Sequence, residues 1–366
     1  MRPLRGAFER LTSFQALWEA SRRARRGKRR SPSTARFEHH VEPELLRLQA
    51  ELRSGAFRFG GYRSFTVQHP QQREIRAAPY RDRVVHHAVC GELEPLVERH
   101  LIYDTYACRV GKGTHRALDR LQHFLRGGSW VVKVDVRKYF FTIDHEILLR
   151  QMRRLYRDPR LDDLLVSLVG GYDAGPEYAF GPNLAFEADR CRPRGLPIGN
   201  LTSQLFANHY LNPVDRFVKE SLGVRRYVRY MDDLVLVAPD RATARDWLEE
   251  VGGALEELRL TPHPRKSQIH PVRNGVRFLG FRVYPHHRRI LRENLQRFSR
   301  RMRRYAARVG EGQPLVDRVE RSLNAWLGFA GRHPNRVFLN AVLEPIRFQP
   351  PRARLPYAFW LPPEPG

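Results

Sequence analysis

Two β-forming runs constrain this chain most, because each carries aspartate beside apolar residues. The run Trp130–Val136 (WVVKVDV) is rich in β-branched residues, and Asp135 stands near its end. In Tyr227–Ala238 (YVRYMDDLVLVA), two β-rich arms flank a turn that holds Asp232 and Asp233, which predicts a hairpin. Since the first run is apolar on both faces, we expect it to lie centrally in a sheet.

The three aspartates need a chemical explanation, since carboxylates beside buried strands are costly unless they are paired or bound to metal. A turn that favours aspartate is the simplest alternative, and a Tyr-x-Asp-Asp string arises by chance in about a few per cent of such chains. Neighbouring strand ends would, however, bring Asp135, Asp232 and Asp233 to one sheet edge, where they repel unless cations neutralise them. Hard oxygen ligands favour Mg²⁺, and two ions about 4 Å apart can activate a 3′-hydroxyl and stabilise departing pyrophosphate. This pattern predicts nucleotidyl transfer.

Helical periodicities surround these strands. The apolar positions are Ile147, Leu148, Met152 and Leu155, then Leu201, Leu205, Tyr210, Val214 and Phe217, and then Leu248, Val251, Leu255 and Leu258. The order strand, helix, helix, hairpin, helix suggests an α+β sheet covered on one face. Upstream, residues 42–52 suit a helix that ends at Ser54-Gly55, and the partial alternation of residues 57–67 (FRFGGYRSFTV) predicts a hairpin.

The charge balance points to a polyanionic partner. Lysine and arginine outnumber aspartate and glutamate by 65 to 39, a formal net charge of +26. An anionic membrane or a merely solvated exterior are the alternatives, but the arginines are spread through periodic, foldable segments, which favours nucleic acid. We interpret the dense run Arg22–Arg30 (RRARRGKRR), which precedes Ser31-Pro32-Ser33, as a solvated arm. A localisation signal or a phosphate-contacting surface remain open for it.

The same chain offers little sign of a membrane or secretory protein. No stretch approaches the roughly 20 apolar residues of a membrane span, and the N-terminus lacks the apolar segment of a secretory signal. The cysteines Cys90, Cys108 and Cys191 are far apart and form no CxxC pair. We therefore expect a soluble, cytoplasmic protein with no membrane partner.

Two amphipathic helices are predicted near the C-terminal end. The first has the apolar positions Leu291, Leu295, Phe298, Met302 and Tyr305, interleaved with arginines, and the second has Leu315, Val319, Leu323 and Trp326. Residues 310–314 (GEGQP) separate them. Together they predict a basic helical subdomain.

The motifs VVKVDVRKYF and RYMDDLVLV resemble palm motifs A and C of reverse transcriptases, in the same order and at a similar separation of roughly a hundred residues. The resemblance extends to Asp82–Val85 (DRVV), Tyr106–Arg109 (YACR), Gly111–Thr114 (GKGT), Lys266 and Phe278–Phe281 (FLGF), the last as a primer grip. It implies a right-hand polymerase of class α+β, with an antiparallel palm sheet that carries helices on one face. The implied domains are an N-terminal extension with fingers (1–125), a palm (126–285, with a fingers segment around 155–198), a helical thumb (286–345) and a tail (346–366).

The same resemblance assigns roles to single residues. Asp135 and Asp232 would ligate two Mg²⁺ ions, for which Mn²⁺ is a possible substitute, and Asp233 and the Val136 carbonyl would assist. Lys266 resembles the family's candidate general acid for pyrophosphate departure, and a phosphate anchor is the alternative for it.

The resemblance also suggests which residues contact substrates. The implied dNTP contacts are Arg73, Arg83, Phe140 as the gate against a 2′-hydroxyl, Ile198, Gly199 and Gln204. The implied nucleic-acid contacts are Tyr230, Met231, Leu279, Gly280, Arg297, Arg301 and Arg304. For Arg73, ordinary surface charge is an equally good interpretation.

One motif departs from most reverse transcriptases. Where they carry Gln-Gly followed by Ser-Pro, this chain reads LPIGNLTSQLFAN over residues 196–208, with Ile198 in place of the amide and Gln204 in place of the proline. This pairing resembles the reverse transcriptases of diversity-generating retroelements, which copy a template-repeat RNA, misincorporate opposite adenines and rewrite a variable gene region. It implies a small basic, ring-forming accessory variability protein as a partner, and a bacterial or phage source. Because isoleucine packs but cannot hydrogen-bond, low fidelity is our hypothesis for this site.

Other interpretations keep part of this account. About 85 residues follow the primer-grip motif, so we expect a thumb without an RNase H or endonuclease domain, unlike retroviral or full-length group II intron proteins. A compact group II-like, retron-like or phage-defence reverse transcriptase is the alternative among enzymes. An RNA-binding scaffold that lacks catalysis is the alternative outside them.

Overall fold

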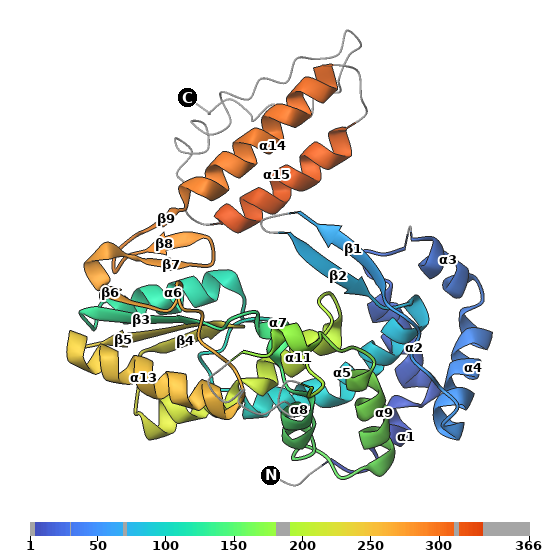
Figure 1. Ribbon diagram of the computed structural model, residues 1–366. Coiled ribbons are helices and arrows are strands. Elements are labelled where there is room, and N and C mark those ends of the chain that lie inside the picture. The colour runs from blue at the N-terminus through green and yellow to red at the C-terminus, as the bar shows by residue number, and fades with distance from the viewer. Residues whose placement is uncertain (1–3, 30, 69–71, 181–190, 311–314, 332–366) are drawn as a thin grey trace. The chain divides into compact units, whose positions relative to one another are not determined.

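The computed structural model of the protein describes residues 4–29, 31–68, 72–180, 191–310 and 315–331. The chain divides into two compact units, Met1–Pro271 and Val272–Gly366 (Figure 1). Within the described residues, no helix has both the length and the apolarity that crossing a bilayer requires.

The N-terminal part of the first unit combines helices with one hairpin. Its elements are α1 (Ala7–Leu11), α2 (Phe14–Ala24), α3 (Pro32–His39), α4 (Val41–Ser54), β1 (Arg63–Val67), β2 (Arg73–Ala77), α5 (Tyr80–His100) and α6 (Thr114–Leu125). The long helix α5 packs against α2 and against a later helix, α11 (Leu201–Tyr210). Helix α4 confirms the helix predicted over residues 42–52, including its end at Ser54.

Two local predictions in this region were wrong. Residues 57–67 do not form a hairpin by themselves, because β1 pairs antiparallel with β2, in register from Arg63 with Ala77 to Val67 with Arg73. The arginine run is not simply a solvated arm either. Its first residues form the last turn of α2, and Arg25 makes a 2.7 Å ion pair with Glu38 of α3. Long-range pairing, which local composition does not reveal, decided both outcomes.

A four-stranded antiparallel sheet forms the centre of the first unit. Its strands are β3 (Trp130–Asp135), β4 (Tyr227–Tyr230), β5 (Asp233–Ala238) and β6 (Gln268–Pro271), in the order β4-β5-β3-β6. The predicted central place of β3 is confirmed. The strong β-formers of β3 and β5 are buried, as their composition predicts.

The remaining elements of the first unit surround this sheet. They are α7 (Tyr139–Thr142), α8 (His145–Met152), α9 (Pro159–Gly170), η1 (Pro176–Tyr178), α11, α12 (Asn212–Arg216), the π-helical turn η2 (Phe217–Ser221) and α13 (Arg241–Glu257). The single helix predicted through Leu201 to Phe217 is interrupted after Tyr210. Pro213 lies in the first turn of α12, where its missing N–H costs no helical hydrogen bond.

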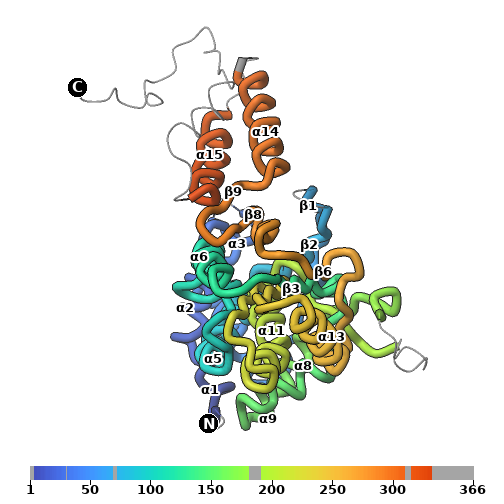
Figure 2. The backbone as a smooth tube through the Cα atoms, turned by 90° about the vertical axis from the view of Figure 1, so that its left-hand side faces the viewer, coloured from blue at the N-terminus to red at the C-terminus, as the bar shows by residue number. Residues whose placement is uncertain are grey.

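The two faces of the sheet have different surroundings. Side chains alternate between the faces of a strand, so Val132 of β3 and Leu234 of β5 share one face, where they join the main core with α13. Lys133, Asp135 and Asp233 point to the other face. Helix α6 contacts β4 and β5, and Figures 1 and 2 place it across the strands from α13.

The second unit is a small sheet followed by two helices. Its elements are η3 (Val272–Asn274), β7 (Val276–Phe278), β8 (Phe281–Val283), β9 (Arg288–Ile290), α14 (Arg292–Gly310) and α15 (Val316–Ala330). The strands pair antiparallel in the order β7-β8-β9. Phe298 of α14 stacks on Trp326 of α15, with ring centroids 4.2 Å apart, which confirms the predicted helix pair. The predicted boundaries of fingers, palm, thumb and tail stay predictions.

Candidate active site

The register of β3 and β5 brings the aspartates to one end of the sheet. Asp135 and Asp233 are direct partners across the two strands, and Asp232 occupies the turn between β4 and β5. The Val136 N–H donates to the Asp232 carbonyl at 3.2 Å, which ties this turn to the end of β3. Residues far apart in the sequence therefore meet because both β-runs enter one antiparallel sheet.

Asp233 has a cation beside it that the sequence analysis did not single out. Lys133 Nζ lies 3.2 Å from Asp233 Oδ2, and both side chains are largely buried. Burial raises the pKa of Asp233 to about 7, Lys133 opposes that rise, and the neighbouring Asp232 adds to it. Its other oxygen, Oδ1, is buried and has no hydrogen-bond partner within the described part of the chain. The sequence signal for this contact was the presence of a lysine inside an otherwise apolar run.

Asp232 and Asp135 also have cations near them. Burial raises the pKa of Asp232, and the charge on Asp135 raises it further, whereas Arg73 and Lys266 lower it. Lys266 Nζ lies 3.4 Å from Asp135 Oδ1 and is half exposed. The loop after α13 thus places Lys266 beside Asp135, and its role in pyrophosphate departure stays a prediction.

These carboxylates fit a hard divalent cation. They offer oxygen donors that repel one another, and a cation would relieve both that repulsion and the unpaired Oδ1 of Asp233. Across the described ranges, however, no three His, Cys, Asp or Glu side chains are arranged to hold a metal ion together. Asp233 contacts Lys133 and Asp135 contacts Lys266, so the metal-binding roles of the three aspartates stay predictions.

The two predicted finger cations have different surroundings. Arg73 begins β2, is exposed, and lies close enough to Asp232 to lower its pKa. Arg83 lies on α5, with its guanidinium 5.2 Å from the centre of the Tyr80 ring, and burial lowers its pKa. Its Nε is buried and unpaired in the described structure. Of these two arginines, Arg73 is therefore the one whose charge acts on Asp232.

The Ile198-Gly199-Asn200 segment is docked on strand β2. The Ile198 carbonyl accepts from the Arg76 N–H at 2.9 Å, and Asn200 Nδ2 donates to the Arg76 carbonyl at 2.9 Å. Gly199 has a φ of 115°, and a Cβ there would lie 2.8 Å from Ile75 Cγ2, so this docking needs glycine. The bonds fix the backbone of Ile198 and leave its side chain partly exposed.

Phe140 and Gln204 lie on either side of this segment in the sequence. The Phe140 carbonyl accepts from the Leu196 N–H at 2.7 Å, which joins α7 to the chain just before the segment. Gln204, on α11, lines a cavity of about 410 Å³ together with Cys90 and Cys108. The dNTP contacts assigned to both residues stay predictions.

The predicted nucleic-acid contacts divide between the two units. In the first unit, Met231 has a φ of 56° and Tyr230 Oη lies 3.3 Å from Thr114 Oγ1. In the second, Leu279 and Gly280 form the β7–β8 turn. Of the arginines on α14, Arg304 is exposed, Arg301 is partly buried against Phe298, and Arg297 donates to the Glu293 carbonyl at 3.1 Å. Of these arginines, Arg304 therefore contributes more to the positively charged surface of α14 than Arg301 does.

The fold and this sheet edge define the class of right-hand, template-dependent polymerases. The chain belongs to the reverse transcriptase (RNA-dependent DNA polymerase) family, whose model matches residues 68–283. It is 27% identical to Protein YkfC of Escherichia coli over 282 residues, 66% of this chain and 71% of YkfC.

Intron-encoded proteins are similar over shorter regions. Group II intron-encoded protein LtrA of Lactococcus lactis is 26% identical over 149 residues, 40% of this chain and 23% of LtrA. A putative COX1/OXI3 intron 1 protein of Saccharomyces cerevisiae is 24% identical over 183 residues, 49% of this chain and 21% of its own length. Among solved structures, Candida albicans telomerase in complex with a telomeric RNA fragment aligns with a TM-score of 0.44 and 10% identity, over 79% of this chain and 55% of the telomerase chain. The chain thus spans less than a quarter of either intron-encoded protein.

Proposed function

We propose that this chain extends a DNA or RNA primer along an RNA template, with Asp135 and Asp232 as the carboxylates that hold two Mg²⁺ ions. The observation that carries the proposal is the register of β3 and β5, which brings Asp135 beside the Asp232-Asp233 turn, with Lys266 at 3.4 Å from Asp135. Bound Mg²⁺ would activate the 3′-hydroxyl and stabilise the charge on the leaving pyrophosphate. Asp233, which pairs with Lys133, would assist these two ligands.

The surrounding residues have distinct tasks in this proposal. Arg73 neutralises part of the negative charge at the aspartates and offers a guanidinium fork for a triphosphate. Lys266 would give a proton to pyrophosphate or anchor it. In this proposal the Val136 carbonyl would help to hold the metal ions, and Phe140 would exclude a 2′-hydroxyl. Arg304 and its neighbours on α14 bind backbone phosphates, so binding should weaken steeply with salt.

The finer proposal is that the chain makes error-prone cDNA from a template-repeat RNA in a diversity-generating retroelement. Ile198 supports it, because the hydrogen bonds to β2 fix its backbone while its side chain offers no polar group to a base pair. A site without that polar contact discriminates weakly between correct and incorrect bases. The ring-forming accessory protein and a bacterial or phage cytoplasm belong to this finer proposal.

A second candidate is a compact group II-like reverse transcriptase. The similarity to LtrA favours it, since LtrA is named as a group II intron-encoded protein. It would use the same carboxylates with a different template and with accurate copying. Fidelity therefore separates the two candidates.

The test is primer extension on a defined RNA template with Mg²⁺, with the products sequenced. Asp232→Ala should abolish synthesis while RNA binding is kept, and Asp163→Ala, at an exposed position on α9, is its matched control. Ile198→Gln should reduce errors opposite template adenines, and Val166→Gln, also exposed on α9, should not.

Each outcome has a defined meaning. Synthesis that survives Asp232→Ala would refute the assignment of the aspartates. Accurate copying by the native chain would favour the group II-like candidate. RNA binding without synthesis under every primer arrangement would favour an RNA-binding scaffold.

A further inference from the structure

A buried arginine lies beneath the turn that carries Asp232. Arg229 belongs to β4, its side chain is fully buried, and its register partner is Leu234. Alternation along the strand therefore directs Arg229 to the face covered by α13, away from Asp233. A buried guanidinium is costly unless its donors are all satisfied, so its contacts show what holds it there.

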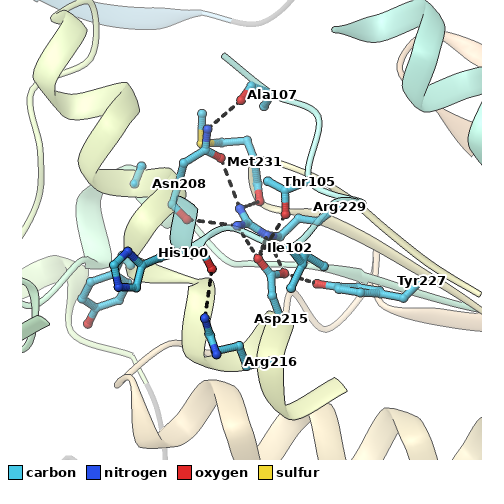
Figure 3. A network of polar contacts seen from close by, with 12 residues as sticks. His100, Ile102, Thr105, Ala107, Asn208, Asp215, Arg216, Tyr227, Arg229 and Met231 are labelled. Carbon is cyan, nitrogen blue, oxygen red and sulfur yellow. Dashed lines mark hydrogen bonds and ion pairs between the residues drawn. The ribbon is translucent and has the colours of Figure 1, made fainter. Parts of the chain in front are cut away.

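Every N–H group of this guanidinium has an acceptor nearby (Figure 3). Nε and Nη2 donate to the two oxygens of Asp215 at 2.7 and 2.6 Å, a fork that only arginine provides. Nη2 also donates to the Asn208 carbonyl at 3.0 Å, and Nη1 lies 3.3 Å from Asn208 Oδ1. Nη1 makes one more bond, at 3.1 Å, to the carbonyl of Met231. These contacts use the five donors of the side chain.

The bond to Met231 connects this network to the proposed metal ligand. Met231 has a φ of 56°, a conformation that costs a non-glycine residue energy. Its carbonyl belongs to the same planar peptide unit as the Asp232 N–H, so holding that oxygen fixes how the chain enters Asp232. On the other side, the Asp232 carbonyl accepts from the Val136 N–H at 3.2 Å. Asp232 is thus fixed from both sides, and Arg229 provides one of the two supports.

Arg229 is itself held from several directions. Asp215 Oδ1 accepts from the Tyr227 hydroxyl at 2.6 Å, and Asp215 Oδ2 accepts from Thr105 Oγ1 at 3.2 Å. The Arg229 backbone bonds residues 104 and 106, with the Arg229 N–H donating at 2.9 Å and its carbonyl accepting at 3.0 Å. Figure 3 shows these groups converging on the guanidinium from β4, α11, α12 and the segment around Thr105. A support held this firmly can define the position of a turn.

We propose that Arg229, clamped by Asp215, is a positioning residue that orients Asp232 for metal binding. It touches neither substrate nor metal, and the proposal rests on the function proposed above. A pair that only stabilised the fold would need no bond to the strained turn. The two roles differ in what they predict for metal affinity.

The experiment uses the full chain and the double variant Arg229→Met/Asp215→Leu, which removes both charges and leaves no unpaired ion in the core. Tyr227→Phe is the matched control, because it removes one bond to Asp215 and keeps the bond from Arg229 to Met231. Arg229→Lys keeps the charge but loses the fork. Circular dichroism first selects the variants that fold, and Mn²⁺ binding is then measured by electron paramagnetic resonance, alongside dNTP KM and kcat in primer extension.

We expect the double variant and Arg229→Lys to bind Mn²⁺ about 10-fold or more weakly, as loss of groups that support metal ligands does. The kcat should fall about 100-fold, the effect of displacing a reacting group by about 1 Å, with dNTP KM within about 3-fold of native. Tyr227→Phe should melt at a lower temperature but keep native Mn²⁺ affinity.

The proposal would be overturned if the folded double variant Arg229→Met/Asp215→Leu had native Mn²⁺ affinity. Native Mn²⁺ affinity in Arg229→Lys would also overturn it. The Mn²⁺ measurement decides this even if the native chain extends no primer, an outcome that would count against the proposed function alone. If the double variant does not fold, weaker Mn²⁺ binding by Arg229→Lys than by Tyr227→Phe supports the proposal, and equal binding overturns it.

Discussion

Two tight turns of this protein present residues predicted to contact primer or metal, yet they are supported in different ways. In the β4–β5 turn, Met231 alone of the two central residues has a positive φ, at a position where hairpins favour glycine. In the β7–β8 turn, Leu279 and Gly280 have φ values of 49° and 84°, the pattern of a type I′ turn with glycine in its second position. The second turn follows local turn chemistry, whereas the first departs from it.

The supports differ in the same way. The Gly280 carbonyl accepts from Leu291 N–H at 3.1 Å and from Asn294 Nδ2 at 2.9 Å, and neither of these bonds involves a charged group. The Met231 carbonyl instead depends on Arg229 and, through it, on Asp215 and the segment around Thr105. The turn that carries the aspartates thus relies on a buried ion pair that is linked to a segment 110 residues from Asp215, whereas the other turn relies on neutral hydrogen bonds alone.

The largest expected effect comes from removing one partner in each support. Asp215→Ala leaves the guanidinium of Arg229 buried without a counter-ion and should cost about 3–5 kcal/mol of the free energy of unfolding. Asn294→Ala removes one hydrogen bond to the Gly280 carbonyl and should cost about 1 kcal/mol. Urea denaturation of both variants measures the difference. Equal costs would end the distinction between a buried ionic support and a neutral one.

Acid should affect the first turn through the helix beneath it. Burial lowers the pKa of His209 to about 4, and the charges on His100 and Arg229 lower it as well. Between the unfolded value near 6.5 and pH 4, the unfolded chain binds more protons, so stability falls as pH falls, by up to about 3 kcal/mol in all. His209→Gln should flatten the dependence of urea stability on pH over this range. An unchanged dependence of urea stability on pH would show that protonation of His209 does not destabilise the fold.

A test of the second turn uses its glycine. In Gly280→Ala, the new Cβ would lie 2.7 Å from Asn294 Nδ2 and 2.8 Å from Phe329 Cζ, at a φ that alanine adopts poorly. We expect a loss of about 1–3 kcal/mol. Gly253→Ala in α13 is the matched control, because nothing lies within 4 Å of its Cβ and helix propensity should add about 1 kcal/mol of stability. Thermal melting compares the two, and a Gly280→Ala variant as stable as native would contradict the importance of this turn's geometry.

The smallest effect is expected from relieving strain directly. Leu279→Gly should change the free energy of unfolding by less than about 1 kcal/mol, since relief at positive φ is offset by added flexibility of the unfolded chain. Met231→Gly should also change the free energy of unfolding only slightly. Relief of the positive φ stabilises the fold, and the lost burial of the methionine side chain destabilises it. Chemical denaturation measures both. A large stabilisation by Met231→Gly would mean that Arg229 holds more strain than the geometry indicates.

Much of the site could be predicted from sequence. The strand β3, the β4–β5 hairpin, the helices α13, α14 and α15 and the meeting of the three aspartates follow from side-chain periodicity and from the position of charge in apolar runs. The strand pairing of β1, the ion pair of Arg25 and the interruption before α12 were not foreseen. Each depends on a partner or a proline effect that the local pattern did not make explicit.

The residues around the aspartates show the same division. Lys133 interrupts an apolar strand and Arg229 stands between Val228 and Tyr230, which marks both as unusual. The sequence around Lys133 and Arg229 does not indicate that their partners are Asp233 and Asp215. It does not indicate the hydrogen bond between the Ile198 carbonyl and the Arg76 N–H either. Charge within a strand predicts that compensation exists, but not which residue provides it.

The sequence by itself determined which segments become strands and helices and where the carboxylates stand along them, because periodicity and turn chemistry act between near neighbours. Only the tertiary structure decided that Lys133 pairs with Asp233, that Asp215 clamps Arg229, and that Arg229 supports the Met231 carbonyl. The physical reason is that a buried charge must be satisfied by whichever groups the folded chain brings within hydrogen-bond distance, and that depends on how the strands and helices pack against one another.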